Sequence, residues 1–249
     1  MPAAADLKAF FAVNNPDIDT GNAGGAIDLL RRPDFTQLAA NDDIEVISSA
    51  AGDTQNCTIV GRNAAGQIVS ETAALTGVTA KIFATLGVIE RVLSVELASV
   101  AIGTITVRRS VAGATVGVIA IGERGFSMIF RKTVSDPSST KNYYTKIFWK
   151  NTHGSQALTS PIIKQNADPD ARIMHLPAAA NDDTATSTNR VTAPAVGDTL
   201  DPDTFDDTDK PITDLGAGVA RGLWLRLQLP SADPAHRTTY TSELTGQSV

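Results

Sequence analysis

The chain has 249 residues, of which 42% are hydrophobic and 19% charged, so it is long enough for two ordinary domains and too apolar to be disordered throughout. Aromatic residues reach only 5%, and much of the apolar content is Ala and Val, which favours thin cores in a scaffold over deep aromatic-lined pockets. The net charge is −6 and the chain has no long basic run, since the nearest approach to one is a single pair, as at 31–32 and 108–109, so no direct nucleic-acid partner is expected.

Residues 1–40 predict an extended N-terminal arm. Their apolar positions are interrupted by Asn14-Asn15-Pro16 and by several glycines, which prevent one long helix. One short helical turn is expected over 26–32, ending before Pro33. Because such an arm cannot form a core, its apolar residues are expected to dock on the body of the protein or on a neighbouring subunit. These docking residues are Leu7, Phe10 and Phe11.

Residues 41–133 change to short runs that alternate apolar and polar side chains, the pattern of half-buried strands. A hairpin is predicted where the run 57–62 ends in Asn63-Ala64-Ala65-Gly66 and continues into 67–75. Short strands with a turn every ten or so residues favour a sandwich or barrel. The expected strands are 44–47, 57–62, 67–75, 91–98, 103–108, 115–121 and 125–132.

A polar stretch at 134–141 suits a domain boundary, and residues 142–249 carry a second set of strands. The pattern at 222–229 alternates leucines with Trp224, Arg226 and Gln228. The expected strands are 143–150, 157–164, 171–176, 222–229 and 238–245. The fold class is therefore all-β, with two β-sandwich domains of immunoglobulin-like or jelly-roll-like type.

The second domain contains a long loop at 177–215, rich in Asp, Thr, Ala, Asn and Pro. Structureless loops of this length are unusual inside compact domains. Ordering costs roughly 1–2 kcal/mol per residue, and the few large apolar residues offer little burial in return. The loop is either mobile or covered by a neighbouring subunit, and we favour the second alternative, with Phe205 as a docking residue.

The single cysteine, Cys57, lies in an apolar-flanked run and is expected to be a small buried hydrophobe. The first 13 residues lack a basic segment followed by an apolar core, and no apolar run approaches the ~20 residues that cross a bilayer. We therefore expect a soluble protein, made in a cytoplasm, with no membrane partner.

No pattern predicts a catalytic, cofactor or metal site, so an enzyme is not expected. The three histidines lie too far apart for the usual zinc spacings. Residues 125–129 supply only half of a serine-hydrolase elbow, and the glycines at 216–222 precede an expected strand instead of the helix that a phosphate-binding loop needs. The aspartates at 198–209 lack the glycine and glutamate of an EF-hand, which favours a solvated acidic loop over a calcium site. The histidines are His153, His175 and His236.

The stretches 44–53 and 57–72 resemble a β-sandwich module of tailed-phage virion proteins, and a later strand at 92–95 fits the same module. The stretches 144–152 and 222–230 are similar to a companion module found in the same kind of protein. Together the resemblance covers about residues 41–109 and 142–245. It implies a structural protein of the virion whose partners are the major capsid protein or other virion proteins.

Three functions are therefore considered. The first is a homo-oligomeric protein that decorates or cements a phage capsid, where the arm and the long loop lap onto neighbouring subunits. The second is a tail or head-to-tail component. The third is a receptor- or carbohydrate-binding module, for which Trp149 and Trp224 would have to form an exposed aromatic platform.

Overall fold

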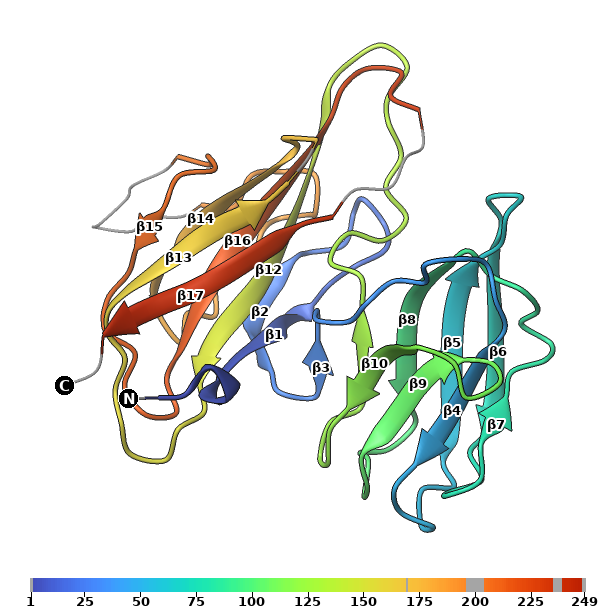
Figure 1. The fold of residues 1–249 in the computed structure, drawn as a ribbon. Coiled ribbons are helices and arrows are strands. Elements are labelled where there is room, and N and C mark those ends of the chain that lie inside the picture. Colours follow the sequence, from blue (N-terminus) through green and yellow to red (C-terminus); the bar gives the residue numbers. More distant parts are fainter. Residues whose placement is uncertain (1, 169, 196–203, 235–238, 248–249) are drawn as a thin grey trace. The chain divides into compact units, whose positions relative to one another are not determined.

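The computed structural model confirms that the chain is all-β, and it describes residues 2–168, 170–195, 204–234 and 239–247. The chain divides into two compact units (Figure 1). Unit 1 consists of Met1–Asp28 together with Phe130–Val249, and unit 2 consists of Leu29–Ile129. Among the described residues, no helix has the length and hydropathy needed to cross a membrane.

Unit 2 is built from two sheets. Its strands are β3 (Arg31–Arg32), β4 (Ile44–Ser48), β5 (Asn56–Arg62), β6 (Ile68–Ala74), β7 (Lys81–Ile82), β8 (Arg91–Leu97), β9 (Ile105–Arg109), β10 (Thr115–Ile119) and β11 (Gly125–Ser127). One sheet has the order β10-β9-β4-β7 and the other the order β3-β11-β8-β5-β6. The predicted hairpin is confirmed, because β5 and β6 pair antiparallel from Asn56↔Ala74 to Arg62↔Ile68.

The core of unit 2 follows from the two-residue period of its strands. Val46 on β4 and Val107 on β9 face inward from one sheet, and Ile59 on β5 and Val95 on β8 face inward from the other. All four are buried in a single cluster. Cys57 is also buried there, as predicted, and burial raises the pKa of its thiol to about 12.

Unit 1 combines a five-stranded and a three-stranded sheet. Its strands are β1 (Leu7–Asn14), β2 (Gly24–Asp28), β12 (Lys141–Asn151), β13 (Thr159–Ala167), β14 (Ile173–Asn181), β15 (Lys210–Pro211), β16 (Ala220–Leu229) and β17 (Thr241–Gln247), and the 3-10 turn Ala4–Asp6 precedes β1. The larger sheet has the order β14-β16-β12-β1-β2, and the smaller has the order β15-β13-β17.

The centre of the larger sheet is buried on both faces. β12 pairs with β16 over ten consecutive residues, from Lys141↔Leu229 to Lys150↔Ala220. Leu223, Trp224 and Leu225 are consecutive, so they point to alternate faces, and all three are buried. Loop segments therefore cover the face that the smaller sheet does not, which places polar loop residues beside an apolar sheet.

Residues 1–40 do not form the expected arm. Residues 7–14 are β1, which pairs antiparallel with β12 from Leu7↔Asn151 to Phe11↔Ile147. The helical turn expected at 26–32 is wrong, because β2 pairs with β1 and β3 pairs with β11. The partner of β1 lies more than a hundred residues along the chain, so no local sequence pattern indicates the pairing. The breaks in the helical pattern therefore fit an undocked arm and a paired strand equally well.

The described parts of the expected loop 177–215 are packed on unit 1. Residues 177–181 belong to β14, and Lys210–Pro211 is β15. Ile212 and Leu215 are buried, and Leu215 pairs with Leu158. These parts therefore need neither mobility nor a neighbouring subunit to account for them, since the unit covers them itself. Residues 134–141, expected as a boundary, also belong to unit 1, whose second segment begins at Phe130.

Candidate functional site

Four turns come together at one end of unit 2, where β4 and β6 finish and β5 and β9 begin (Figure 1). They are residues 49–54, 76–79, 98–104 and 120–123. The amide of Ser48 donates to the carbonyl of Gly77 at 3.0 Å, and the amide of Gly77 donates to that of Asp53 at 3.1 Å. The amide of Ala101 donates to the carbonyl of Glu123 at 2.9 Å, and the amide of Ser49 donates to the carbonyl of Thr104 at 2.9 Å. The four turns therefore form one hydrogen-bonded group.

The carboxylate of Asp53 organises this group from inside. It has no exposed surface, and it accepts hydrogen bonds from the amides of Ile102 at 2.9 Å and Gly103 at 2.8 Å. The Ser48 hydroxyl donates to it at 2.5 Å, and the Gln55 amide at 3.1 Å. Burial alone would raise the pKa of Asp53, but these donors outweigh it and hold the pKa below its usual value. The carboxylate is therefore a fixed acceptor that joins two turns.

Two glycines allow the turns to approach closely. Gly77 has φ +63°, and a Cβ there would lie 2.6 Å from the carbonyl oxygen of Ala51. A Cβ on Gly103 would lie 2.6 Å from the Cβ of Ala50. Side chains at either position would push the turns apart, so the shape of this end of unit 2 depends on both glycines.

Apolar side chains project from the group to the outside. We call the exposed side chains of Val78, Val100, Ile102 and Ile121 the apolar tip, and each of them is between 44% and 68% exposed. Ile102 approaches Gly52 of the neighbouring turn, where a Cβ would lie 3.5 Å from its Cδ1 atom. Exposed apolar side chains that gather on one part of a surface mark interaction sites, whereas scattered ones do not.

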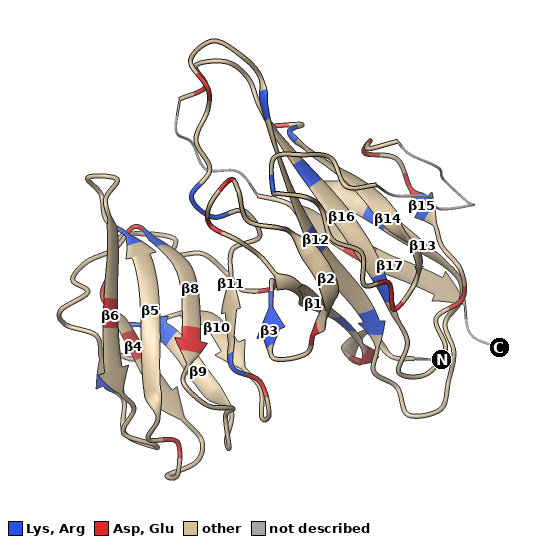
Figure 2. Cartoon of the chain, turned by 180° about the vertical axis from the view of Figure 1, so that it is seen from behind, with Lys and Arg blue, Asp and Glu red and all other residues tan. Residues whose placement is uncertain are grey.

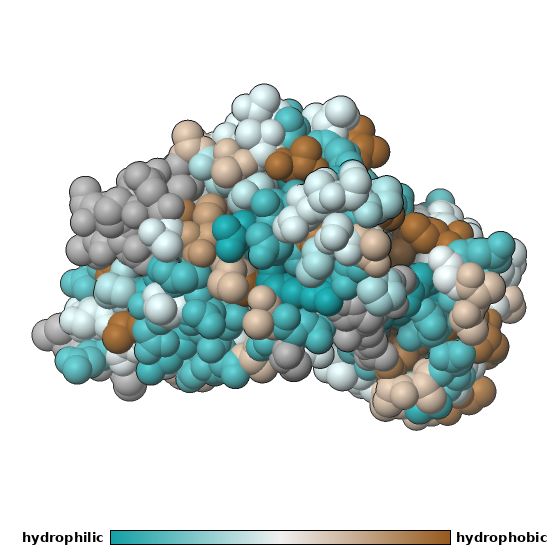
Figure 3. Space-filling view, turned by 90° about the horizontal axis from the view of Figure 1, so that it is seen from above, coloured by the Kyte–Doolittle hydropathy of each residue, from teal (hydrophilic) through white to brown (hydrophobic). Residues whose placement is uncertain are grey.

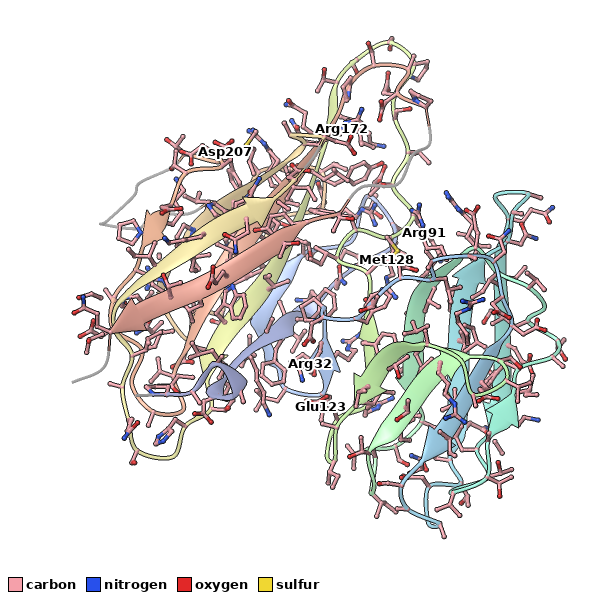
Figure 4. All side chains as sticks on the ribbon, in the orientation of Figure 1. Arg32, Arg91, Glu123, Met128, Arg172 and Asp207 are labelled. Carbon is pink, nitrogen blue, oxygen red and sulfur yellow. The ribbon has the colours of Figure 1, made fainter. Side chains whose placement is uncertain are left out.

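Charge is absent from the outside of these turns. Asp53 and Glu123 are the only charged residues in the four turns, and both are buried. Glu123, labelled in Figure 4, turns its carboxylate back to accept from the amide of Ala120 at 3.2 Å. Acidic and basic residues are spread over the rest of the chain (Figure 2). The apolar tip therefore offers a partner an apolar surface with no charge to desolvate.

Exposed apolar residues also occur elsewhere, but in a different setting. The face in Figure 3 shows hydrophobic residues separated by hydrophilic ones. Isolated residues of this kind are normal on a protein surface. The apolar tip differs because its side chains stand on turns joined to one another.

The sequence carries a partial signal for this site. Three of the four tip residues adjoin a glycine, in Gly77-Val78, Ile102-Gly103 and Ile121-Gly122. A β-branched residue beside a turn glycine has no strand face to occupy, so it is directed toward solvent. What the sequence does not reveal is that these turns lie at the same end of the unit.

The predicted docking residues lie in other places. Phe10 and Phe11 are 5% and 1% exposed, so they pack in the core of unit 1, the first of the two alternatives expected for them, and are not exposed to a neighbouring subunit. Leu7 is half-buried at the start of β1. Phe205 is half-buried and packs edge-to-face on Tyr144, with 5.5 Å between ring centroids. The structure therefore does not bring these four residues together into one surface.

Two buried polar side chains in unit 1, Lys146 and His175, bind loop residues that lie over the sheet. Lys146 has no exposed surface, and its ammonium lies against Asp183 and above the Phe148 and Trp224 rings. His175 is also fully buried, and its Nε2 atom donates to the carbonyl of Thr208 at 2.8 Å. Each side chain attaches a loop to the sheet beneath it.

The acidic loop lies only partly within the described residues, because Asp198, Asp201 and Asp203 fall outside them. Asp206 pairs with the buried Lys210 at 2.8 Å, and Asp209 lies 3.6 Å from Lys164. Asp207 is exposed on the same segment (Figure 4). In the part of the chain that the structure describes, no three His, Cys, Asp or Glu side chains are grouped to hold a metal ion.

The two tryptophans do not form an exposed platform. Trp224 has no exposed surface and belongs to a core cluster with Leu176 and Ala178. Trp149 is half-buried, and its enclosed indole nitrogen has no hydrogen-bond partner among the residues that the structure describes. An aromatic platform of the kind that binds sugars would therefore have to do without Trp224.

No protein-family model, curated protein or solved structure matches the chain. Its function is therefore inferred from its residues and their geometry.

Proposed function

We propose that the chain is a structural protein of a tailed-phage particle, most directly a decoration or cement protein that binds the capsid. The observation that carries the proposal is the apolar tip of unit 2, where β-branched side chains stand exposed on hydrogen-bonded turns without surface charge. The sequence resemblance to phage virion modules supplies the class of particle. The partners are the major capsid protein or other virion proteins.

The mechanism is mechanical. Burial of an apolar side chain stabilises a contact by roughly 25 cal/mol per Å² of surface removed from water, and rigid turns lose little conformational freedom on docking. Asp53 keeps the turns in place before the partner arrives, since its carboxylate is saturated by donors within unit 2. A repeated contact of this kind adds stability to a shell without any chemical step.

A tail or head-to-tail component would use the same surface, so the position of the chain on the particle separates these two alternatives. The receptor- or carbohydrate-binding alternative is less favoured because Trp224 is buried.

The proposal is tested by a pair of matched variants. Val78 and Val88 are 56% and 55% exposed and lie in the same unit, but only Val78 belongs to the apolar tip. Val88 lies near the opposite end, next to Ile89, which pairs with Asp42 before β4 begins. Each is replaced by Asp, the variants are supplied during infection in place of the wild-type chain, and the chain in purified particles is quantified.

The proposal expects Val78→Asp to lower the amount of particle-bound chain at least tenfold, with Val88→Asp close to wild type. Equal incorporation of both variants would contradict docking through the apolar tip. Far-ultraviolet circular dichroism of each purified variant shows whether a loss reflects docking or folding.

A further inference from the structure

The four sheets end in eight edge strands, and an open edge is a place where another chain can add a strand. Three of the edges, β3, β7 and β15, are only two residues long. The β2 edge is covered, because Gly25 donates to the carbonyl of Ala185 at 2.8 Å. The β14 edge is covered in the same way, where His175 pairs with Asp206.

Two of the remaining edges are irregular. The pairing of β10 with β9 shifts register between Thr115 and Gly117, and Thr36 occupies the carbonyl of Val116 at 2.7 Å. The pairing of β17 with β13 shifts register at two points. Such irregularities are a usual protection of edges against further pairing.

The eighth edge, β6, is neither covered by a paired backbone nor irregular, and its one inward-facing charge, Glu71, accepts a hydrogen bond from the amide of Leu86 at 2.7 Å. It pairs with β5 over seven consecutive residues without a shift of register. It contains no proline and no lysine, and Glu71 is its only charged residue, as Figure 2 shows. The strand lies at the margin of its sheet in Figures 1 and 2.

The register shows which backbone groups of β6 are free. The amide of Leu75 donates to the carbonyl of Gln55, and the amide of Asn63 donates to that of Gln67, so odd-numbered residues of β6 bond to β5. The even-numbered residues therefore direct their N–H and C=O groups away from β5. These outward-directed N–H and C=O groups belong to Ile68, Ser70, Thr72 and Ala74. No described residue donates a hydrogen bond to them or accepts one from them.

The side chains on the outer face of β6 carry no charge. Ile68, Ser70, Thr72 and Ala74 are exposed and uncharged. The Thr72 hydroxyl lies 2.8 Å from that of Thr58 on β5, which fixes this row on the outer face of the sheet. Val69 and Ala73 point the other way and pack on the core of unit 2.

We infer that β6 is a self-association edge, where β6 of a second copy of the chain adds antiparallel and joins the two sheets into one. The occupant is a second copy because the edge is self-complementary. An antiparallel second copy presents the same N–H and C=O pairs at the same two-residue spacing. The outer-face side chains of β6 are uncharged in both copies, so no charges of the same sign meet on that face. The contact goes beyond the proposed function, since it joins copies of the chain whatever particle they enter.

Glu71 limits the register of this pairing. Centring the two-fold axis on Glu71 would place two carboxylates directly opposite each other, which destabilises a strand pair. Centring it on Ser70 places Glu71 opposite Val69, and centring it on Thr72 places Glu71 opposite Ala73. The pairing therefore uses one of these two centres.

Sedimentation velocity of the purified full chain over a concentration series tests the inference. The wild type is expected to form dimers as the concentration rises. In Thr72→Pro the ring removes an edge N–H that takes no part in the β5 ladder, so the fold is kept and the dimer dissociation constant rises at least tenfold. Thr72→Val keeps the N–H group and is the matched control, expected to dimerise like the wild type.

Cysteine cross-linking keeps the inference testable if the proline variant does not fold. Residues that face each other across a hydrogen-bonded antiparallel pair have Cα atoms ~5.5 Å apart, within disulfide range. Under mild oxidation, either Ser70→Cys or Thr72→Cys is expected to form a disulfide-linked dimer, and Glu71→Cys is not. The native Cys57 is buried and does not interfere.

A wild type that stays monomeric across the series would overturn the inference. So would a folded Thr72→Pro that dimerises like Thr72→Val, or the absence of cross-linking at both Ser70→Cys and Thr72→Cys. These measurements use the chain alone, so their failure leaves particle docking to be decided separately.

Discussion

Lys146, a residue with no exposed surface, donates to both the side-chain carboxylate and the backbone carbonyl of Asp183. The lysine stands on β12, and Asp183 follows β14. Gly222 on the neighbouring strand makes room for the lysine stem, because a Cβ there would lie 2.6 Å from the Cε atom of Lys146. The pair therefore fastens a polar loop over a sheet face that would otherwise be apolar and uncovered.

Breaking this pair from the acidic side should be strongly destabilising. Asp183→Ala leaves the Lys146 ammonium buried without its counter-charge, and we expect unit 1 to lose about 3–5 kcal/mol of unfolding free energy. Lys146→Met removes the buried charge itself and should cost less. Both tryptophans lie in unit 1, so urea unfolding followed by tryptophan fluorescence measures the effect. A larger loss in Lys146→Met than in Asp183→Ala would contradict this account.

The stability of unit 1 should fall in mild acid because of His175. Burial lowers the pKa of His175, the hydrogen bond to Thr208 opposes this effect, and the nearby Lys210 ammonium adds to it. The unfolded chain, with a histidine pKa of about 6.5, therefore takes up the proton first as pH falls. The stability that the neutral His175 contributes is fully present above the pKa of the unfolded state. It is lost as pH falls through the lower pKa of His175 in the folded state.

Thermal unfolding at pH 7.5 and pH 5.0 provides the measurement. His175→Gln cannot take up the proton, so its melting temperature should fall less between the two pH values than that of the wild type. An equal fall in both proteins would show that His175 does not cause the acid sensitivity.

Removing the Asp53 carboxylate should loosen the turns that carry the apolar tip. Asp53→Ala leaves the buried amides of Ile102 and Gly103 without their acceptor, so unit 2 should lose about 2–3 kcal/mol. Cys57 labelling in urea follows unit 2, which contains neither Trp nor Tyr. Particle incorporation should fall together with stability. Wild-type stability of unit 2 in Asp53→Ala would show that the carboxylate does not hold the turns.

Cys57 should be unreactive in the folded chain. It is fully buried, and its pKa of about 12 leaves almost no thiolate at pH 8. A colorimetric thiol reagent should therefore label the folded protein far more slowly than the protein in denaturant. Rapid labelling without denaturant would mean that the core of unit 2 opens readily.

The sequence was most informative about unit 2, where alternation is local. Ile105 and Val107 alternate with polar residues in one sheet, and the Asn63–Gly66 turn identifies the β5–β6 hairpin. It was least informative about β1 and β2. β1 pairs with β12, which brings Phe10 opposite Phe148, far along the chain, so the apolar residues of β1 had the pattern of an undocked arm.

The candidate site was harder to predict than the fold. Val78, Val100 and Ile121 belong to separate turns, and only the folded sheets bring these turns to one end of unit 2. The alternating pattern of β16 does not show which face Trp224 occupies or whether that face is covered. In the structure both faces are buried, and Trp224 lies in the core. Loop covering depends on pairs such as Lys146 and Asp183, whose proximity no local pattern predicts.

Immunogold electron microscopy of the phage particle that the proposed function requires, with an antibody raised against this chain, tests the central claim most directly. The account predicts label spread evenly over the head. Label confined to one vertex or to the tail would replace decoration by the tail or head-to-tail alternative. Absence of the chain from purified particles, both on their surface and after disruption, would contradict a structural role in the virion.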